Sequence, residues 1–204
     1  MFYKICRYFF YAIIVCFWGI KINGKRKLNQ KEPLIIAANH ISYLDPIALG
    51  VAYDREIHFF AKKEVFDVPI LGLIVRWLKA IPVDREKTNA NSIKKSIKVL
   101  KKGFVLGVFP EGTRSANGEL LEFSMGMIKI ALKTSTPILP VGINGTFEAY
   151  PPKSKFPKIF KRRPIYINFG KPIYLDSSMQ KDIKYQKECL VRIKKEIKRL
   201  SSVN

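Results

Sequence analysis

The chain has 204 residues, which suits one domain with a full hydrophobic core and leaves little room for two. Apolar residues make up 48% of the chain, a share that excludes disorder by composition, and three irregularly spaced cysteines argue against a disulfide scaffold and a zinc site. The formal net charge of +21 predicts an acidic partner, which is nucleic acid, an anionic membrane, or an acidic carrier with phosphorylated substrates.

The N-terminal segment contains an uncharged apolar run over residues 8–20, with basic residues on both sides. A bilayer-spanning helix needs about 20 apolar residues, so this run is short for a span. No small-residue cleavage site follows it, which argues against a secretory signal peptide. The aromatic residues and the flanking positive charges predict a helix that lies in the membrane interface or dips into it, and a buried core helix is the alternative. We therefore expect a membrane-associating helix over residues 1–25.

After residue 25, short apolar runs alternate with segments in which apolar residues recur at helical spacing. The runs at 34–38, 57–60, 80–83, 104–109, 138–143 and 164–169 predict strands. Helices are predicted from Asp45-Pro46 onward and over 69–79, 90–102, 125–133 and 182–200. This alternation predicts an α/β fold for residues 26–204, with a mixed, largely parallel sheet flanked by helices.

The first candidates for chemistry are His40 and Asp45, which follow the predicted strand at 34–38. Active sites of open α/β sheets gather at the carboxyl ends of strands. A turn between the two residues can bring the carboxylate to the imidazole Nδ1, which leaves Nε2 to take a proton from a substrate hydroxyl. On spacing alone, a buried structural histidine beside a helix-capping aspartate fits equally well. The other histidine, His58, lies in a predicted strand, and we expect it to be structural.

The second candidate is the segment 109–115, FPEGTRS, which follows the predicted strand at 104–109. Gly112 permits a sharp turn or the close approach of a ligand to the backbone. Arg114 offers a planar fork that suits a phosphate, and Glu111 can orient this arginine or hold a substrate hydroxyl. An ordinary polar turn with an internal Glu–Arg pair is the alternative.

Taken together, the H-x-x-x-x-D spacing and the FPEGTRS segment resemble the glycerolipid acyltransferase family, the 1-acylglycerol-3-phosphate acyltransferases. Two more segments match in family order. The second block corresponds to 62–66, 69–72 and 80–85, and the fourth block corresponds to 138–143. The four blocks cover about residues 34–145, so the resemblance implies an acyltransferase domain over residues 26–204.

The resemblance implies a role for each matched residue. His40 is the expected general base and Asp45 its support. Binding of the glycerol phosphate is expected at Glu111, Gly112, Thr113 and Arg114, with further phosphate contacts at Arg85, Lys62 and Lys63. The resemblance also implies a thioester of acyl-carrier protein or coenzyme A as co-substrate, with no cofactor and no metal. The chain has no G-x-S-x-G motif and no base near a cysteine in sequence, which favours direct transfer over a covalent acyl-enzyme.

The expected reaction transfers a fatty acyl group to the free hydroxyl of 1-acylglycerol 3-phosphate, giving phosphatidic acid for phospholipid synthesis. Glycerol 3-phosphate or another lysophospholipid is the alternative acceptor. A nucleic-acid binder is disfavoured because the basic residues are scattered and no recognised motif occurs. A non-catalytic lipid-binding relative is disfavoured by the intact His40–Asp45 pair. We expect the enzyme to bind an anionic membrane surface, lysophosphatidate and the acyl thioester, and to sit peripherally or monotopically on the cytoplasmic side of the cell membrane.

Overall fold

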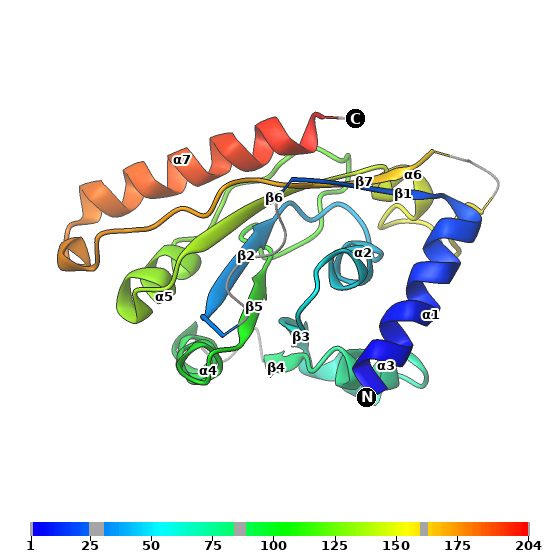
Figure 1. Cartoon of the computed structure of the whole chain (residues 1–204), viewed down its shortest axis with the longest axis horizontal. Coiled ribbons are helices and arrows are strands. Elements are labelled where there is room, and N and C mark those ends of the chain that lie inside the picture. The colour runs from blue at the N-terminus through cyan, green and yellow to red at the C-terminus, as the bar shows by residue number, and fades with distance from the viewer. Residues whose placement is uncertain (1, 25–30, 84–88, 160–162, 204) are drawn as a thin grey trace.

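The computed structural model describes residues 2–24, 31–83, 89–159 and 163–203, which form a sheet with helices on both faces (Figure 1). The strands are β1 (Ile20–Asn23), β2 (Leu34–Ala38), β3 (Ile57–Lys62), β4 (Ile81–Val83), β5 (Val105–Val108), β6 (Ile138–Asn144) and β7 (Ile165–Phe169). The α-helices are α1 (Phe2–Phe17), α2 (Asp45–Ala52), α3 (Leu71–Trp77), α4 (Asn89–Lys101), α5 (Gly126–Thr134), α6 (Thr146–Ala149) and α7 (Ile183–Ser201). Short 3-10 helices, η1 (Lys63–Asp67) and η2 (Ser177–Met179), precede α3 and α7.

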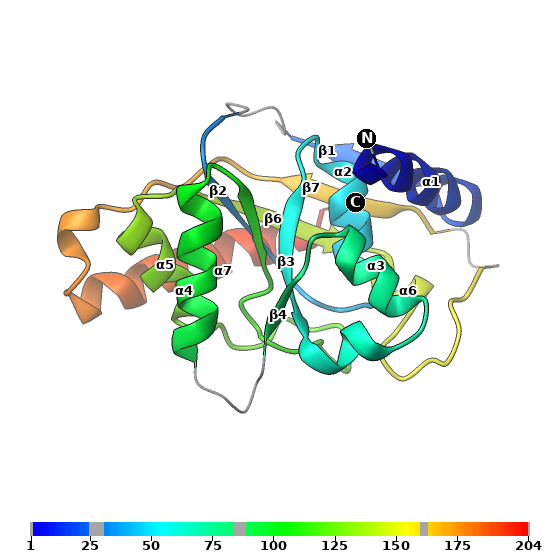
Figure 2. The ribbon, with the colours of Figure 1, turned by 90° about the horizontal axis from the view of Figure 1, so that it is seen from below.

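The sheet has the strand order β1-β7-β6-β2-β5-β3-β4. Strands β6, β2, β5, β3 and β4 run parallel to one another, whereas β7 pairs antiparallel with β6 and β1 pairs parallel with β7. The predicted mixed, largely parallel sheet is therefore confirmed. Because the carboxyl ends of parallel strands meet at one edge, the segments that follow β2, β5, β3 and β6 share an edge of the sheet (Figure 2).

The packing of strand β2 on both of its faces explains why its sequence is apolar at every position. Leu34, Ile36 and Ala38 belong to the core cluster beneath α1 and α2. Ile35 and Ala37 belong to the cluster under α4, α5 and α7 on the opposite face. Since side chains alternate between the faces of a strand, a strand covered on both sides needs an apolar residue at each place. All five residues are at most 2% exposed, which makes β2 the centre of the domain.

The N-terminal helix belongs to the packed structure through one of its faces. Ile14 is 1% exposed and lies in the core cluster, and Arg7 Nη2 bonds Asp54 Oδ1 at 2.9 Å. The opposite face leaves Tyr8 70% and Phe9 59% exposed. Among the described residues, no helix is both long and apolar enough to cross a membrane. The helix is therefore amphipathic, with a core-facing side and an exposed apolar side.

Strand β1 was not predicted, because we assigned residues 1–25 to the N-terminal helix. Its four residues alternate between half-buried Ile20 and Ile22 and exposed Lys21 and Asn23, and they extend the sheet beside β7. The side chains of Asn23 and Asn168 join across this pair at 2.8 Å, although the two residues lie 145 positions apart. A four-residue alternation is too short to separate from the end of an apolar run by pattern alone.

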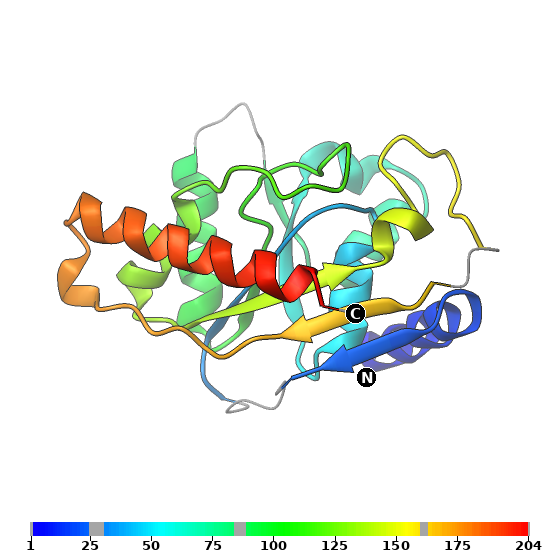
Figure 3. The same ribbon diagram turned by 90° about the horizontal axis from the view of Figure 1, so that it is seen from above.

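The C-terminal helix α7 lies along β6 (Figure 3). At Gly142 of β6, an added Cβ would fall 2.1 Å from the carbonyl carbon of Leu200, so only glycine permits this approach. The side-chain amide of Asn168 donates to the carbonyl oxygens of Leu200 and Val203 at 2.9 Å each, which ties the end of α7 to β7. Gly142, in the fourth block of the sequence, thus allows the backbone of α7 to pack directly against β6.

Candidate active site

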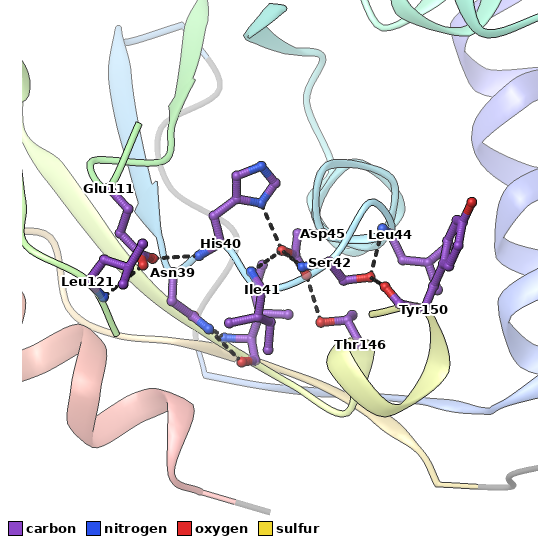
Figure 4. A network of polar contacts seen from close by, with 11 residues as sticks. Asn39, His40, Ile41, Ser42, Leu44, Asp45, Glu111, Leu121, Thr146 and Tyr150 are labelled. Carbon is purple, nitrogen blue, oxygen red and sulfur yellow. Dashed lines mark hydrogen bonds and ion pairs between the residues drawn. The ribbon is translucent and has the colours of Figure 1, made fainter. Parts of the chain in front are cut away.

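Three strands deliver polar side chains to one place at the carboxyl edge of the sheet (Figure 4). His40 follows β2, Glu111 follows β5, and Thr146 begins α6 just after β6. Asp45 begins α2, with Pro46 in its first turn as predicted. The turn between His40 and Asp45 brings together side chains that a continuous helix would point to different faces.

The carboxylate of Asp45 is the centre of the polar network. Asp45 is fully buried, and its Oδ2 lies 2.9 Å from His40 Nδ1. The same oxygen accepts the backbone N–H groups of Ile41 and Ser42 at 2.7 Å each, and Oδ1 accepts the hydroxyl of Thr146 at 2.6 Å (Figure 4). Because an ionised carboxylate only accepts, His40 Nδ1 donates to it and Nε2 of the neutral ring is left as an acceptor.

The imidazole of His40 is held by stacking as well as by Asp45. Its ring stacks on Phe109 with centroids 4.1 Å apart, and Phe109 stacks in turn on Phe59 at 5.7 Å. The His40 side chain retains 18% exposure, so the ring is fixed in orientation yet reachable from solvent. An oriented and accessible imidazole is what a general base requires.

Glu111 supports the backbone at His40 and has no ion pair with Arg114 among the described residues. Its Oε1 accepts the N–H of His40 at 2.7 Å and its Oε2 accepts the N–H of Leu121 at 2.9 Å. Burial raises the pKa of the Glu111 carboxyl, and the two N–H donors partly oppose that rise. The interpretation in which Glu111 orients the arginine is thus replaced by one in which it joins the β5 loop to the end of β2.

Arg114 is half-buried and carries an unused hydrogen-bond donor. Its guanidinium carbon lies 3.5 Å from the centre of the Tyr43 ring, a cation–π contact. Its Nη1 is buried and has no hydrogen-bond partner within the part of the chain that the structure describes. A buried donor of this kind costs free energy until an acceptor arrives, and a guanidinium is well suited to an anion. Gly112, at φ +69°, makes the turn that leads to it.

The remaining predicted residues that the structure describes form no hydrogen bond or ion pair with the Asp45 network. Lys62 and Lys63 lie exposed at the carboxyl end of β3, which is separated from β2 by β5. Arg85 lies outside the described residues. Thr113 is exposed in the loop after β5. His58 lies in β3, where burial lowers the pKa of its imidazole and its Nδ1 pairs with the carbonyl oxygen of Lys79 at 3.1 Å.

Sequence reasoning missed Thr146 and Tyr43. Thr146 lies just beyond the strand predicted at 138–143, separated from it by Asn144 and Gly145. Its position at the end of a strand therefore indicated a place near the site. Tyr43 stands inside the His40–Asp45 segment, but no pattern indicates that its ring contacts Arg114. Such contacts depend on the approach of the loops after β2 and β5, which local sequence does not encode.

Thr146 permits a direct test of the buried network. We expect Thr146→Val to lower the free energy of unfolding by about 1–3 kcal/mol, because the buried Oδ1 of Asp45 loses its donor. Thr146→Ser keeps the hydroxyl and should retain more of this stability. Urea unfolding of both variants measures the difference. Wild-type stability in Thr146→Val would show that the hydroxyl does not stabilise the network.

Comparison with known proteins assigns the chain to a family. The family model described as "Acyltransferase" matches residues 19–144. A 1-acyl-sn-glycerol-3-phosphate acyltransferase of Bacillus subtilis is 33% identical over 173 residues, covering 84% of this chain and 82% of the relative. A protein of the same name from Borreliella burgdorferi is 30% identical over 204 residues, covering 94% of this chain and 77% of the relative.

The fold has a solved counterpart. The crystal structure of the 1-acyl-sn-glycerophosphate acyltransferase PlsC from Thermotoga maritima matches with a TM-score of 0.73 and 26% identity. The match covers 96% of this chain and 79% of that one, so it includes the sheet and the helices on both faces. Sequence and fold thus agree, and the chain belongs to the acyltransferase family that includes the 1-acyl-sn-glycerol-3-phosphate acyltransferases.

Proposed function

We propose that this acyltransferase transfers a fatty acyl group from an acyl thioester to the free hydroxyl of 1-acylglycerol 3-phosphate, which yields phosphatidic acid. The donor is acyl-carrier protein or coenzyme A charged with the acyl chain. His40 Nε2 removes the proton of the acceptor hydroxyl as the oxygen attacks the thioester carbonyl carbon. The new C–O ester bond forms, the C–S bond breaks, and the proton passes to the departing thiolate.

One observation carries this proposal: the 2.9 Å contact between His40 Nδ1 and the fully buried carboxylate of Asp45. The carboxylate fixes the tautomer in which Nε2 accepts, and its negative charge stabilises the imidazolium formed when Nε2 takes the proton. Two backbone N–H groups and one hydroxyl also hold the carboxylate in place. The positioning therefore precedes substrate binding and needs no rearrangement of Asp45.

We place the acceptor phosphate at Arg114. The support is its buried Nη1 without a partner and the Tyr43 ring that holds the guanidinium plane. Gly112 and Thr113 in the same loop are proposed as further contacts to the glycerol phosphate, with Glu111 holding that loop against His40. Lys62 and Lys63, and Arg85 beyond the described residues, are proposed as more distant sources of positive charge for phosphorylated substrates.

The proposed reaction is tested with the purified full chain. We would incubate it with 1-acylglycerol 3-phosphate and either acyl-carrier-protein or coenzyme A thioesters, and identify the lipid by mass. The expected product is the lysophosphatidate mass plus one acyl group. A parallel reaction with glycerol 3-phosphate tests the acceptor. Acylation of glycerol 3-phosphate alone would contradict the proposed acceptor, and no acyl transfer to either would contradict the reaction.

The phosphate site predicts the behaviour of Arg114→Lys. Lysine keeps the charge but lacks the planar fork, so we expect the KM for lysophosphatidate to rise by about tenfold or more, with a smaller change for the acyl donor. Steady-state kinetics with each substrate varied in turn measures this difference. Arg199→Lys, an exposed arginine on α7, is the matched control and should leave both constants unchanged. Unchanged lysophosphatidate kinetics in Arg114→Lys would place the phosphate elsewhere.

We also propose that α1 attaches the enzyme to the cytoplasmic surface of the membrane without spanning it. The support is its exposed apolar face, where Ile5 is 57% and Phe9 59% exposed, together with the basic net charge of the chain. Acyl thioesters are made in the cytosol, and the substrate would enter from the lipid beside the helix.

The exposed face of α1 predicts the effect of two substitutions. Replacing both Ile5 and Phe9 by glutamine should weaken binding to anionic vesicles by about tenfold or more, because the inserted apolar area is lost. Vesicle sedimentation at several lipid concentrations measures this change. The matched control replaces Ile183 and Val191 by glutamine. These two residues are 57% and 66% exposed on α7, and their replacement should leave vesicle binding intact. Equal weakening by both pairs would show that the contact is not specific to α1.

A further inference from the structure

The segment between α6 and β7 contains an exposed basic and aromatic loop that the reaction does not use. Residues 151–163 hold six basic residues and no acidic one. Within the described part, 151–159, which we term the Phe156 loop, Phe156 is 77% exposed and Ile159 is 39% exposed. The lysines of this loop are also exposed, at positions 153, 155 and 158. The loop thus presents two exposed apolar side chains among its exposed lysines.

The Phe156 loop has a defined shape. Ser154 closes a turn, since its N–H donates to the carbonyl oxygen of Pro151 at 3.0 Å and its hydroxyl donates to that of Phe156 at 2.7 Å. The N–H of Lys158 donates to the carbonyl oxygen of Ala149 at 2.7 Å, which closes the loop at its base. The exposure of Phe156 therefore belongs to a hydrogen-bonded turn.

The loop is joined both to α1 and to the active site. The indole Nε1 of Trp18, just after α1, donates to the carbonyl oxygen of Lys158 at 3.0 Å. At the other end, the carbonyl oxygen of Tyr150 accepts the hydroxyl of Ser42 at 2.7 Å, and the Tyr150 ring lies 5.3 Å from that of Tyr43, which holds Arg114. The loop after α6 thus lies at the carboxyl edge of the sheet, beside the elements that carry the site (Figures 2 and 3).

We infer that the Phe156 loop is a second membrane contact, which inserts Phe156 into the headgroup region of an anionic bilayer while its lysines bind acidic lipid headgroups. The alternation of exposed lysines with exposed apolar residues is the pattern of a peripheral lipid contact. An acidic protein or a nucleic acid would use the lysines but gain less from Phe156 and Ile159. The inference rests on the proposed function, since it places the lipid surface next to Arg114, where a membrane-held lysophosphatidate must present its phosphate.

The aromatic part of this contact is tested by Phe156→Ala in the full chain. We expect binding to phosphatidylcholine vesicles that contain phosphatidylglycerol to weaken by about tenfold, because the inserted ring is lost. Tyr174→Ala is the matched control, since Tyr174 is an aromatic residue 71% exposed at another part of the surface. In direct support, bilayers with brominated acyl chains should quench the tryptophan fluorescence of Phe156→Trp more strongly than that of wild type. The fluorescence of Tyr174→Trp should not show this additional quenching. Equal behaviour of the two positions in both assays overturns the inference.

The charged part is tested by replacing Lys153, Lys155 and Lys158 together with glutamine. Vesicle binding at low salt should weaken by roughly tenfold to a hundredfold, and the difference should shrink at high salt, where the Phe156→Ala effect persists. The matched triple variant removes the same charge from the exposed lysines of α7, at positions 184, 187 and 195. If both triple variants lose binding equally, only net charge matters and the loop is not a site. If acyl-carrier-protein binding falls while vesicle binding is unchanged, the occupant is an acidic protein and the inference is overturned.

These vesicle experiments need no catalysis, so they separate this inference from the proposed reaction. If the wild-type chain binds vesicles through Phe156 but acylates no lysophosphatidate, the contact stands and the proposed function fails. If acyl transfer occurs and Phe156→Ala changes neither vesicle binding nor turnover of bilayer-embedded acceptor, the function stands and the contact fails. A short-chain, water-soluble acceptor should be used equally well by wild type and Phe156→Ala.

Discussion

Replacement of His40 by alanine is expected to lower acyl-transfer turnover by about 10²- to 10⁴-fold while the protein stays folded. The imidazole Nε2 is the proposed proton acceptor, so its loss leaves the acceptor hydroxyl protonated when it attacks. The fold should survive because the His40 side chain packs at the rim of the site, with 18% exposure. Single-turnover measurements with saturating substrates, alongside circular dichroism, measure rate and fold together.

His58 offers a matched control because it is the only other histidine of the chain. Its ring lies 5.0 Å from Phe104 and its Nδ1 pairs with the backbone of Lys79, away from the Asp45 network. We expect His58→Ala to retain most of the turnover of wild type. Near-normal turnover in a folded His40→Ala protein would contradict the proposed mechanism.

Asp45→Asn should reduce turnover almost as strongly, by about 10²- to 10⁴-fold, with only a modest loss of stability. The remaining carbonyl oxygen can still accept from His40 Nδ1 and from the N–H groups of Ile41 and Ser42, and the new amide can donate to the hydroxyl oxygen of Thr146. What is lost is the negative charge that stabilises the imidazolium. The measurement is turnover at saturating substrates together with urea unfolding.

Asp45→Ala distinguishes the charge from the scaffold. Alanine leaves two buried N–H groups without an acceptor, so this variant should lose about 2–5 kcal/mol of unfolding free energy in addition to its activity. A folded Asp45→Asn protein with wild-type turnover would show that Asp45 only builds the turn. A similar stability loss in both variants would show that the amide cannot replace the carboxylate in the network.

The central strands were predictable because burial on both faces requires apolar residues, which are visible in their sequences. Strand β2 is apolar at each position since both of its faces are covered, and Asp45-Pro46 gives the start of α2 directly. Strand β1 was not predictable in the same way, because its stability comes from β7, a partner far along the chain. For α1, pattern alone did not divide the run into a face with Ile14 in the core and a face with Phe9 exposed.

The sequence predicts which residues form the site better than it predicts the contacts between them. His40 and Glu111 each follow a predicted strand, and the structure brings them together. However, the sequence left open whether Glu111 orients Arg114 or holds a substrate hydroxyl. In the structure its carboxylate accepts the backbone N–H groups of His40 and Leu121. Which donor reaches a given carboxylate depends on how two loops approach each other in space, and residue type does not fix that.

The pairing of β1 with β7 has a consequence for how the protein is made. The contact between Asn23 and Asn168 joins residues 145 positions apart, so β1 has no partner until β7 has left the ribosome. Contacts of such long sequence separation close late in folding because the intervening chain must first lose much of its entropy. The nascent chain thus carries β1 without its partner strand through most of translation. Early binding of this N-terminal segment by a chaperone would protect the unpaired strand from aggregation until the sheet is complete.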